Sequence, residues 1–150
     1  MQKVRIANWL LEVDIERTQE FYNTEHIEMC DCLYCINFIK ASKSFDRSIL
    51  GVFNSLGIDC SKPENLSEFG LNPKGERLYT GFYHFMGRML AGEYCTNNEW
   101  DDKNTFQIKN FRIGFSINLT DVHDTVPKQI LQIEFECTIP WLKDDSLEGN

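Results

Sequence analysis

The sequence predicts an α+β fold, in which helices from the N-terminal half pack on one face of an antiparallel sheet. Three observations predict it. Apolar residues recur with helical spacing between residues 14 and 57, they alternate strictly in "FRIGFSINL" and "QIEFECTI", and they alternate on both sides of Ala7-Asn8. The C-terminal half therefore supplies most of the sheet and an N-terminal hairpin joins it. The 150 residues fit one domain, placed at 1–143, with a polar tail at 144–150.

The N-terminal half predicts three helices. The first spans residues 14–23 and is capped by Asp14, with acidic residues in its first turn. The second spans residues 32–42, where a set of apolar side chains falls at i, i+3, i+4 and i+7, namely Cys32, Cys35, Ile36 and Ile39. The third begins after Ser44 as N-cap and ends at Gly57.

The second half predicts strands. Residues 58–77 carry two prolines and two glycines and are expected to form a long connection. A long aromatic strand follows at 77–90, then a loop, and then half-buried strands at 106–119 and 129–139.

Net charge narrows the classes of partner. The chain carries 23 acidic and 15 basic side chains, a net charge of −8, and none of its segments is basic. Nucleic acids and anionic membranes are therefore disfavoured as partners, whereas a basic protein partner fits. The N-terminus lacks the apolar run of a signal peptide, which predicts a cytoplasmic protein with reduced cysteines. The oligomeric state is not predicted.

The stretch "CDCLYC" is the first candidate site, and three interpretations of it stay open. Cys30, Cys32 and Cys35 provide three thiol ligands for Zn²⁺, with His26 as a candidate fourth; Cys60, Cys95 or His84 are the alternatives for that position. Alternatively, Cys32 and Cys35 pack as small apolar residues, which leaves Cys30 unexplained. The third interpretation is thiol redox chemistry, although no preceding strand gives the Cys-x-x-Cys a thioredoxin-like context.

The polar face of the predicted sheet is the second candidate site. If the strands pair as a meander, alternation gathers the side chains suited to acid–base chemistry: His84, Arg88, Arg112, Glu134 and Glu136. The competing interpretation is an ordinary solvated sheet face with cross-strand Arg–Glu pairs.

Several stretches together resemble a family of small uncharacterised bacterial proteins of Firmicutes type. They are "FYNTEH", "CDCLYCINF", "SLGID", "LYTGFYHFMGRML" and "QIEFECTIPW", which run through most of the chain. Its Cys-x-Cys-x-x-Cys-x-Asn pattern matches Cys30, Cys32, Cys35 and Asn37 here. The family has no assigned activity, so the resemblance implies a bacterial cytosolic origin and no catalytic residues.

Taken together, these features favour a small acidic cytosolic binding or interaction module, with a structural zinc at the cysteine stretch and no clear sign of an enzyme. Two alternatives remain. One is a small hydrolase or transferase that uses the His/Glu/Arg patch, and the other is a thiol-based metal or redox sensor.

Overall fold

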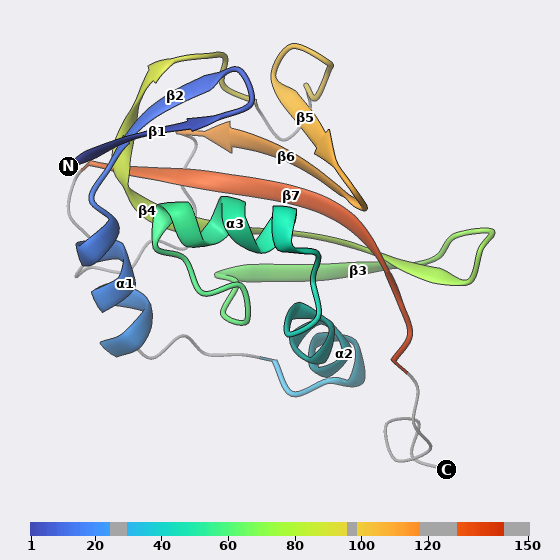
Figure 1. Cartoon of the computed structure of the whole chain (residues 1–150). Coiled ribbons are helices and arrows are strands. Elements are labelled where there is room, and N and C mark those ends of the chain that lie inside the picture. The colour runs from blue at the N-terminus through green and yellow to red at the C-terminus, as the bar shows by residue number, and fades with distance from the viewer. Residues whose placement is uncertain (25–29, 96–98, 118–128, 143–150) are drawn as a thin grey trace.

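A computed structural model describes residues 1–24, 30–95, 99–117 and 129–142, and within these ranges the chain forms three helices and seven strands. The described strands pair antiparallel in one sheet of order β1-β2-β4-β7-β6-β5, and β3 pairs with β4 beside this path. The α+β prediction is confirmed, including the N-terminal hairpin (Figure 1). The tail predicted at 144–150 lies outside the described residues.

Strand β4 (Glu76–Ala91) organises the sheet. On one side it pairs with β7 (Ile130–Pro140) along most of its length. On the other side its first half pairs with β3 (Asn65–Leu71), and its second half pairs with β2 (Trp9–Val13) of the N-terminal hairpin. Strand β1 (Gln2–Ile6) closes that edge.

The prediction that residues 58–77 form only a connection is wrong, because β3 lies within them. Pro63 precedes this strand and Pro73 lies in the turn after it, so neither removes a donor from the ladder. β3 is also an edge strand, with Phe69 and Leu71 exposed. Its weak alternation explains why the sequence did not indicate a strand here.

The single strand predicted at 106–119 is a hairpin instead. β5 (Thr105–Ile108) and β6 (Phe111–Ser116) pair antiparallel around a turn at Lys109 and Asn110. Lys109 adopts a φ of 53°, a left-handed conformation in which a lysine is uncommon. The apolar alternation shifts by one residue at this turn, from Phe106 and Ile108 to Phe111 and Ile113, and the single-strand prediction overlooked this break.

The helices are α1 (Ile15–Thr24), α2 (Leu33–Ser42) and α3 (Arg47–Leu56). Asp46, not Ser44, caps α3, because its carboxylate accepts the backbone N–H of Ser48. Gly57 ends α3 as predicted, with a φ of 83°. A Cβ at this position would lie 2.5 Å from the carbonyl oxygen of Ile15, so α1 and α3 meet closely here. None of the described helices is both long and apolar enough to cross a membrane.

Helix α1 covers a gap in the sheet edge. Between the parts of β4 that pair with β3 and β2, none of the described strands pairs with His84 and Met86 on that side. The Tyr22 hydroxyl accepts the N–H of His84 (3.0 Å) and donates to its carbonyl (2.9 Å). The Thr18 hydroxyl accepts the N–H of Met86, and the Asp14 N–H donates to the Met86 carbonyl. Side chains of α1 thus replace part of a strand.

The core lies between α2, α3 and the concave face of the sheet. Phe38 of α2 stacks on Phe135 of β7, and Phe53 of α3 packs against Tyr83 of β4. The sheet also curls, because Trp9 of β2 contacts aromatic rings on β5 and β6, those of Phe106 and Phe115. Figure 1 shows α3 lying across this curved sheet.

Candidate functional site

The three thiols of "CDCLYC" gather at the N-terminus of α2. Cys32 is the N-cap, Cys35 lies in the first turn, and Cys30 precedes the helix. Their Sγ atoms all lie within 4.8 Å of one another. A tetrahedral Zn²⁺ with Zn–S bonds of about 2.3 Å holds its sulfurs about 3.8 Å apart. Small side-chain rotations would therefore bring the three thiols to bonding positions.

The thiol of Cys32 has a lowered pKa. Burial acts to raise the pKa of its thiol, but hydrogen bonds from the Cys35 N–H and from the Cys30 and Cys35 thiols outweigh burial, so the pKa is lowered. The Cys35 N–H lies 3.4 Å from the Cys32 sulfur. The positive end of α2 also favours a thiolate at the N-cap.

Cys35 behaves in the opposite way. Its side chain is buried, and burial, together with hydrogen bonds to the thiols of Cys32 and Cys30, raises its pKa to about 12. At neutral pH this thiol keeps its proton unless a bound cation displaces it. A metal ion at the cluster must therefore release that proton, which makes metal affinity depend on pH.

The sheet holds the first turn of α2 in place. The Tyr79 hydroxyl on β4 donates to the carbonyl of Tyr34 (2.7 Å). Asn37 is fully buried, and its amide donates to the Pro140 carbonyl while its oxygen accepts the N–H of Leu142 (2.7 Å). The asparagine of the motif therefore anchors the helix to the end of β7, a role that the sequence did not reveal.

The predicted apolar stripe on α2 is wrong. The helix buries a different face, made by Cys35, Asn37, Phe38, Ala41 and Ser42. Cys32 is only half-buried and Cys30 is exposed, so packing does not account for either thiol. The reason is that the Cys32 sulfur caps the helix instead of pointing into the core.

The fourth zinc ligand is not identified among the described residues. His26 lies outside them. The alternatives lie elsewhere in the fold: Cys60 next to Tyr83, His84 beside Gln132, and Cys95 against Gly114. The described part of the chain therefore brings three of the predicted ligands together.

The strand register brings most of the residues predicted for the polar face of the sheet onto neighbouring strands. His84 lies opposite Gln132, Arg112 lies opposite Glu136, and Phe82 lies opposite Glu134. The expectation of a solvated face fails at its centre, where His84, Gln132 and Glu134 are buried. The chain before β5 covers this centre, since a Cβ on Gly114 of β6 would meet the Cys95 sulfur and the Asn104 carbonyl.

Arg88 does not belong to this group. It is exposed near the far end of β4, where its guanidinium donates to Glu12 of β2 (3.0 Å). Four of the five predicted residues therefore share three neighbouring strands, and the fifth forms a surface ion pair.

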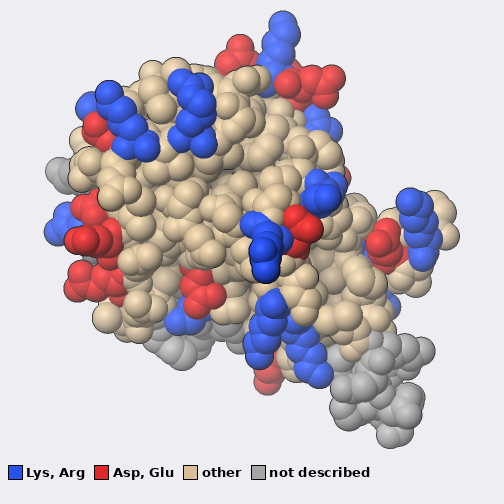
Figure 2. All heavy atoms as spheres, in the orientation of Figure 1, with Lys and Arg blue, Asp and Glu red and all other residues tan. Residues whose placement is uncertain are grey.

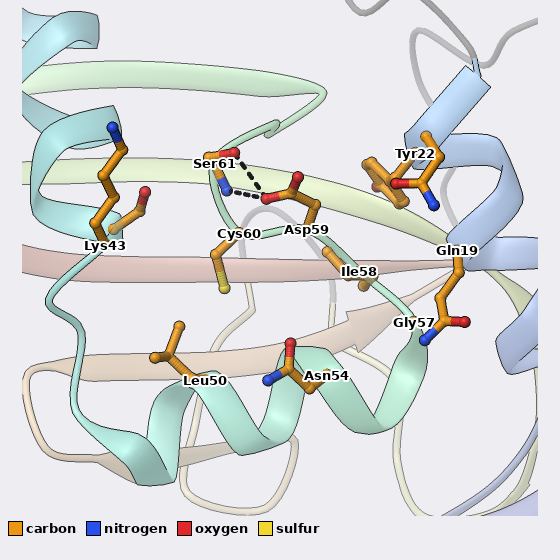
Figure 3. A pocket seen from close by; sticks show the side chains of 12 residues that line it. Gln19, Tyr22, Lys43, Leu50, Asn54, Gly57, Ile58, Asp59, Cys60 and Ser61 are labelled. Atoms are coloured by element: carbon orange, nitrogen blue, oxygen red, sulfur yellow. Dashed lines mark hydrogen bonds between the residues drawn. The ribbon is translucent and has the colours of Figure 1, made fainter.

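A cavity of about 610 Å³ between α1, α3 and the turn after α3 was not predicted (Figure 3). Its polar lining is mostly neutral, with Gln19 and Asn54 among its residues. Its carboxylate, Asp59, accepts the N–H and hydroxyl of Ser61, as the dashed lines show. This cavity thus brings together neither an acid–base pair nor a set of metal ligands.

Surface charge is mixed on the face that carries α3. Figure 2 shows basic and acidic side chains interspersed among uncharged residues over this face. This side offers no broad basic area of the kind that binds a phosphate backbone.

No family model, curated protein or solved structure matches this chain. The resemblance to small bacterial proteins therefore stays a prediction, and the function has to be argued from the site itself.

Proposed function

We propose that this chain is a small zinc-binding module in which Cys30, Cys32 and Cys35 bind one Zn²⁺ ion. The observation that carries the proposal is the convergence of three sulfur atoms within 4.8 Å at a helix N-terminus. Thiolate is the ligand type that zinc prefers in structural sites. The metal would link Cys30, which precedes α2, to the first turn of the helix and so hold this part of the chain in place.

The remaining coordination position belongs to His26 in this proposal, with water as its alternative. A histidine four residues before the first cysteine is close enough in sequence to reach the same ion. The site requires reduced thiols, which supports a cytoplasmic location. The net charge of −8 supports a basic protein as partner of the module and disfavours nucleic acid.

Metal analysis of untagged protein, purified under reducing conditions, tests the proposal. We expect one zinc per chain by mass spectrometry of the metal content. Cobalt substitution should give sulfur-to-metal charge-transfer absorption. Cys30→Ser, Cys32→Ser and Cys35→Ser should each weaken zinc binding by at least about tenfold, because each removes one bond to the metal. Protein without stoichiometric zinc would refute the proposal.

Two further variants sharpen the result. Cys60→Ala removes a thiol outside the cluster and should keep full zinc occupancy. His26→Ala should weaken zinc binding if the imidazole is the fourth ligand and leave it unchanged if water is.

The zinc affinity of the wild type should fall as pH falls. The reason is that protons compete with zinc for the Cys35 sulfur, because the pKa of this thiol is raised.

Redox sensing is the second candidate function, favoured by the lowered pKa of Cys32 beside the buried Cys35 thiol. Hydrogen peroxide would oxidise the Cys32 thiolate to a sulfenic acid and release hydroxide. The Cys35 sulfur would then attack the sulfenic sulfur, forming a disulfide and releasing water. Mass spectrometry of metal-free protein treated with peroxide should find a Cys32–Cys35 disulfide that Cys60→Ala leaves unchanged. Oxidation distributed over all the exposed thiols would contradict this candidate.

A further inference from the structure

A second cavity, of about 530 Å³, opens on the face of the sheet that the helices leave uncovered. Its volume is within the range of small-molecule sites, roughly 300–1,000 Å³. The side chains that line it come from β3, β4, β6, β7 and the loop before β5, and include Asn65, Thr80, Phe82, Trp100, Arg112, Glu134 and Glu136. It lies on the opposite side of the sheet from the cysteine cluster.

Two carboxyl groups face this cavity from β7. Glu134 is only 5% exposed and lies at the floor, while Glu136, two residues along the same strand, is exposed at the rim. Residues two apart on a strand point to the same face, about 7 Å from each other along the chain. A ligand within the cavity would therefore meet both groups.

Glu134 is held in a fixed orientation. The amide of Gln132 donates to its carboxyl oxygen (3.1 Å), and the amide oxygen of Gln132 lies 2.9 Å from Nε2 of His84. Burial raises the pKa of Glu134, although hydrogen bonds from Gln132 and Ser116 oppose the increase. The ionised carboxylate is thus destabilised until a compensating positive charge enters.

The rest of the lining suits a positive charge. Phe82 and Trp100 provide aromatic rings, which attract cations through their negative faces. Arg112 is the basic side chain of the lining, and it is engaged elsewhere: its Nε donates to Thr105 (2.8 Å) and its Nη2 lies 3.9 Å from Asp102. The lining therefore holds two carboxyl groups and one guanidinium, and Asp102 outside the lining lies close to that guanidinium.

We propose that this cavity binds a small organic cation that carries an ammonium or guanidinium group. Glu134 and Glu136 bind its charged group, and Phe82 and Trp100 contact its carbon skeleton. The bound cation favours the ionised form of Glu134, so binding releases a proton in the pH range where that carboxyl is still protonated in the empty cavity. This proton release distinguishes a cation from a neutral ligand.

Titration calorimetry with putrescine tests the proposal, with 1,4-butanediol as the neutral ligand of the same length. We expect putrescine to bind and the diol not to bind. The measured heat should change between buffers of different ionisation enthalpy, which reports the released proton. Agmatine serves as the guanidinium probe. If neither putrescine nor agmatine binds, or if the diol binds equally well, the proposal is wrong.

Substitutions of the two glutamates test whether the cation binds in this cavity. Glu134→Gln should weaken binding by about tenfold to a hundredfold and abolish the buffer dependence, because the amide carries no charge. Glu136→Gln changes an exposed side chain and should also weaken binding. Glu20→Gln, on the exposed side of α1, is the matched control and should bind as the wild type does. Equal binding by Glu134→Gln, Glu136→Gln and the control would place the cation elsewhere and overturn the assignment.

Discussion

At the scale of single residues, Glu134 has the most distinctive surroundings in the described part of the sheet. It is a carboxyl group at the floor of a cavity, nearly buried between strands and oriented by an amide. Burial favours its neutral form, so its pKa is raised. This shift has a consequence for stability as well as for ligand binding.

Glu134 should make the fold less stable as pH rises. Below the pKa of a glutamate in the unfolded chain, about 4.3, Glu134 is protonated in both the folded and the unfolded state. Its ionisation then does not change the free energy of unfolding. As pH rises toward the raised pKa of the folded state, the unfolded chain loses its proton first and the free energy of unfolding falls. Each unit of raised pKa corresponds to about 1.4 kcal/mol.

Urea unfolding of the wild type and Glu134→Gln across pH 4 to 8 measures this effect. The free energy of unfolding of the variant, minus that of the wild type, should increase as pH increases, since glutamine does not titrate. Other titrating groups cancel in the difference. A difference that stays constant with pH would show that the carboxyl is not destabilised by burial.

The sequence predicted the residues of both candidate sites better than their surroundings. It placed Cys30, Cys32 and Cys35 together because they are close along the chain. It also placed Arg112 and Glu136 on one face of the sheet, because alternation fixes the face of each strand, but it did not give the register that sets them opposite each other. It did not predict the burial of His84 and Glu134, which depends on how a loop covers the sheet. Neither secondary-structure propensity nor the spacing of apolar residues predicts such a long-range contact.

At the scale of elements, α1 is more than a surface helix. Its hydroxyl groups bond backbone groups of β4 that pair with no strand on that side in the described part of the chain. The helix was predicted from its period and its cap, but the sequence did not show that Thr18 and Tyr22 would serve the sheet. A hydroxyl on the buried face of an amphipathic helix is the signal that points to such a role.

Tyr22→Phe should lower the free energy of unfolding by about 1–3 kcal/mol, because it leaves the buried N–H and carbonyl of His84 without this partner. The ring itself is retained, so packing changes little. Thr24→Ala on the same helix is the control: it removes an exposed hydroxyl that donates to the Glu20 carbonyl and should cost less than about 0.5 kcal/mol. Urea unfolding curves compare the two, and equal costs would show that Tyr22 contributes only packing.

At the scale of the whole molecule, the apolar pattern of the sequence predicted the fold class, but it did not predict every element of the sheet. The two features of the sheet that were missed, β3 and the β5–β6 turn, are both at its periphery. The central strands β4 and β7 were predicted closely, because burial on the helix side imposes strict alternation on them. The two candidate sites lie on opposite sides of the sheet, so each can be altered without touching the other.

The covering of β4 by α1 also bears on how this protein behaves when it is stressed. A backbone edge that is closed by side chains and not by a strand reopens as soon as the helix detaches, and detaching one helix requires less than unfolding the sheet. The exposed groups of His84 and Met86 would then accept a strand from another molecule. Aggregation of this chain on mild heating would accordingly begin at the middle of β4, within a sheet that is otherwise intact.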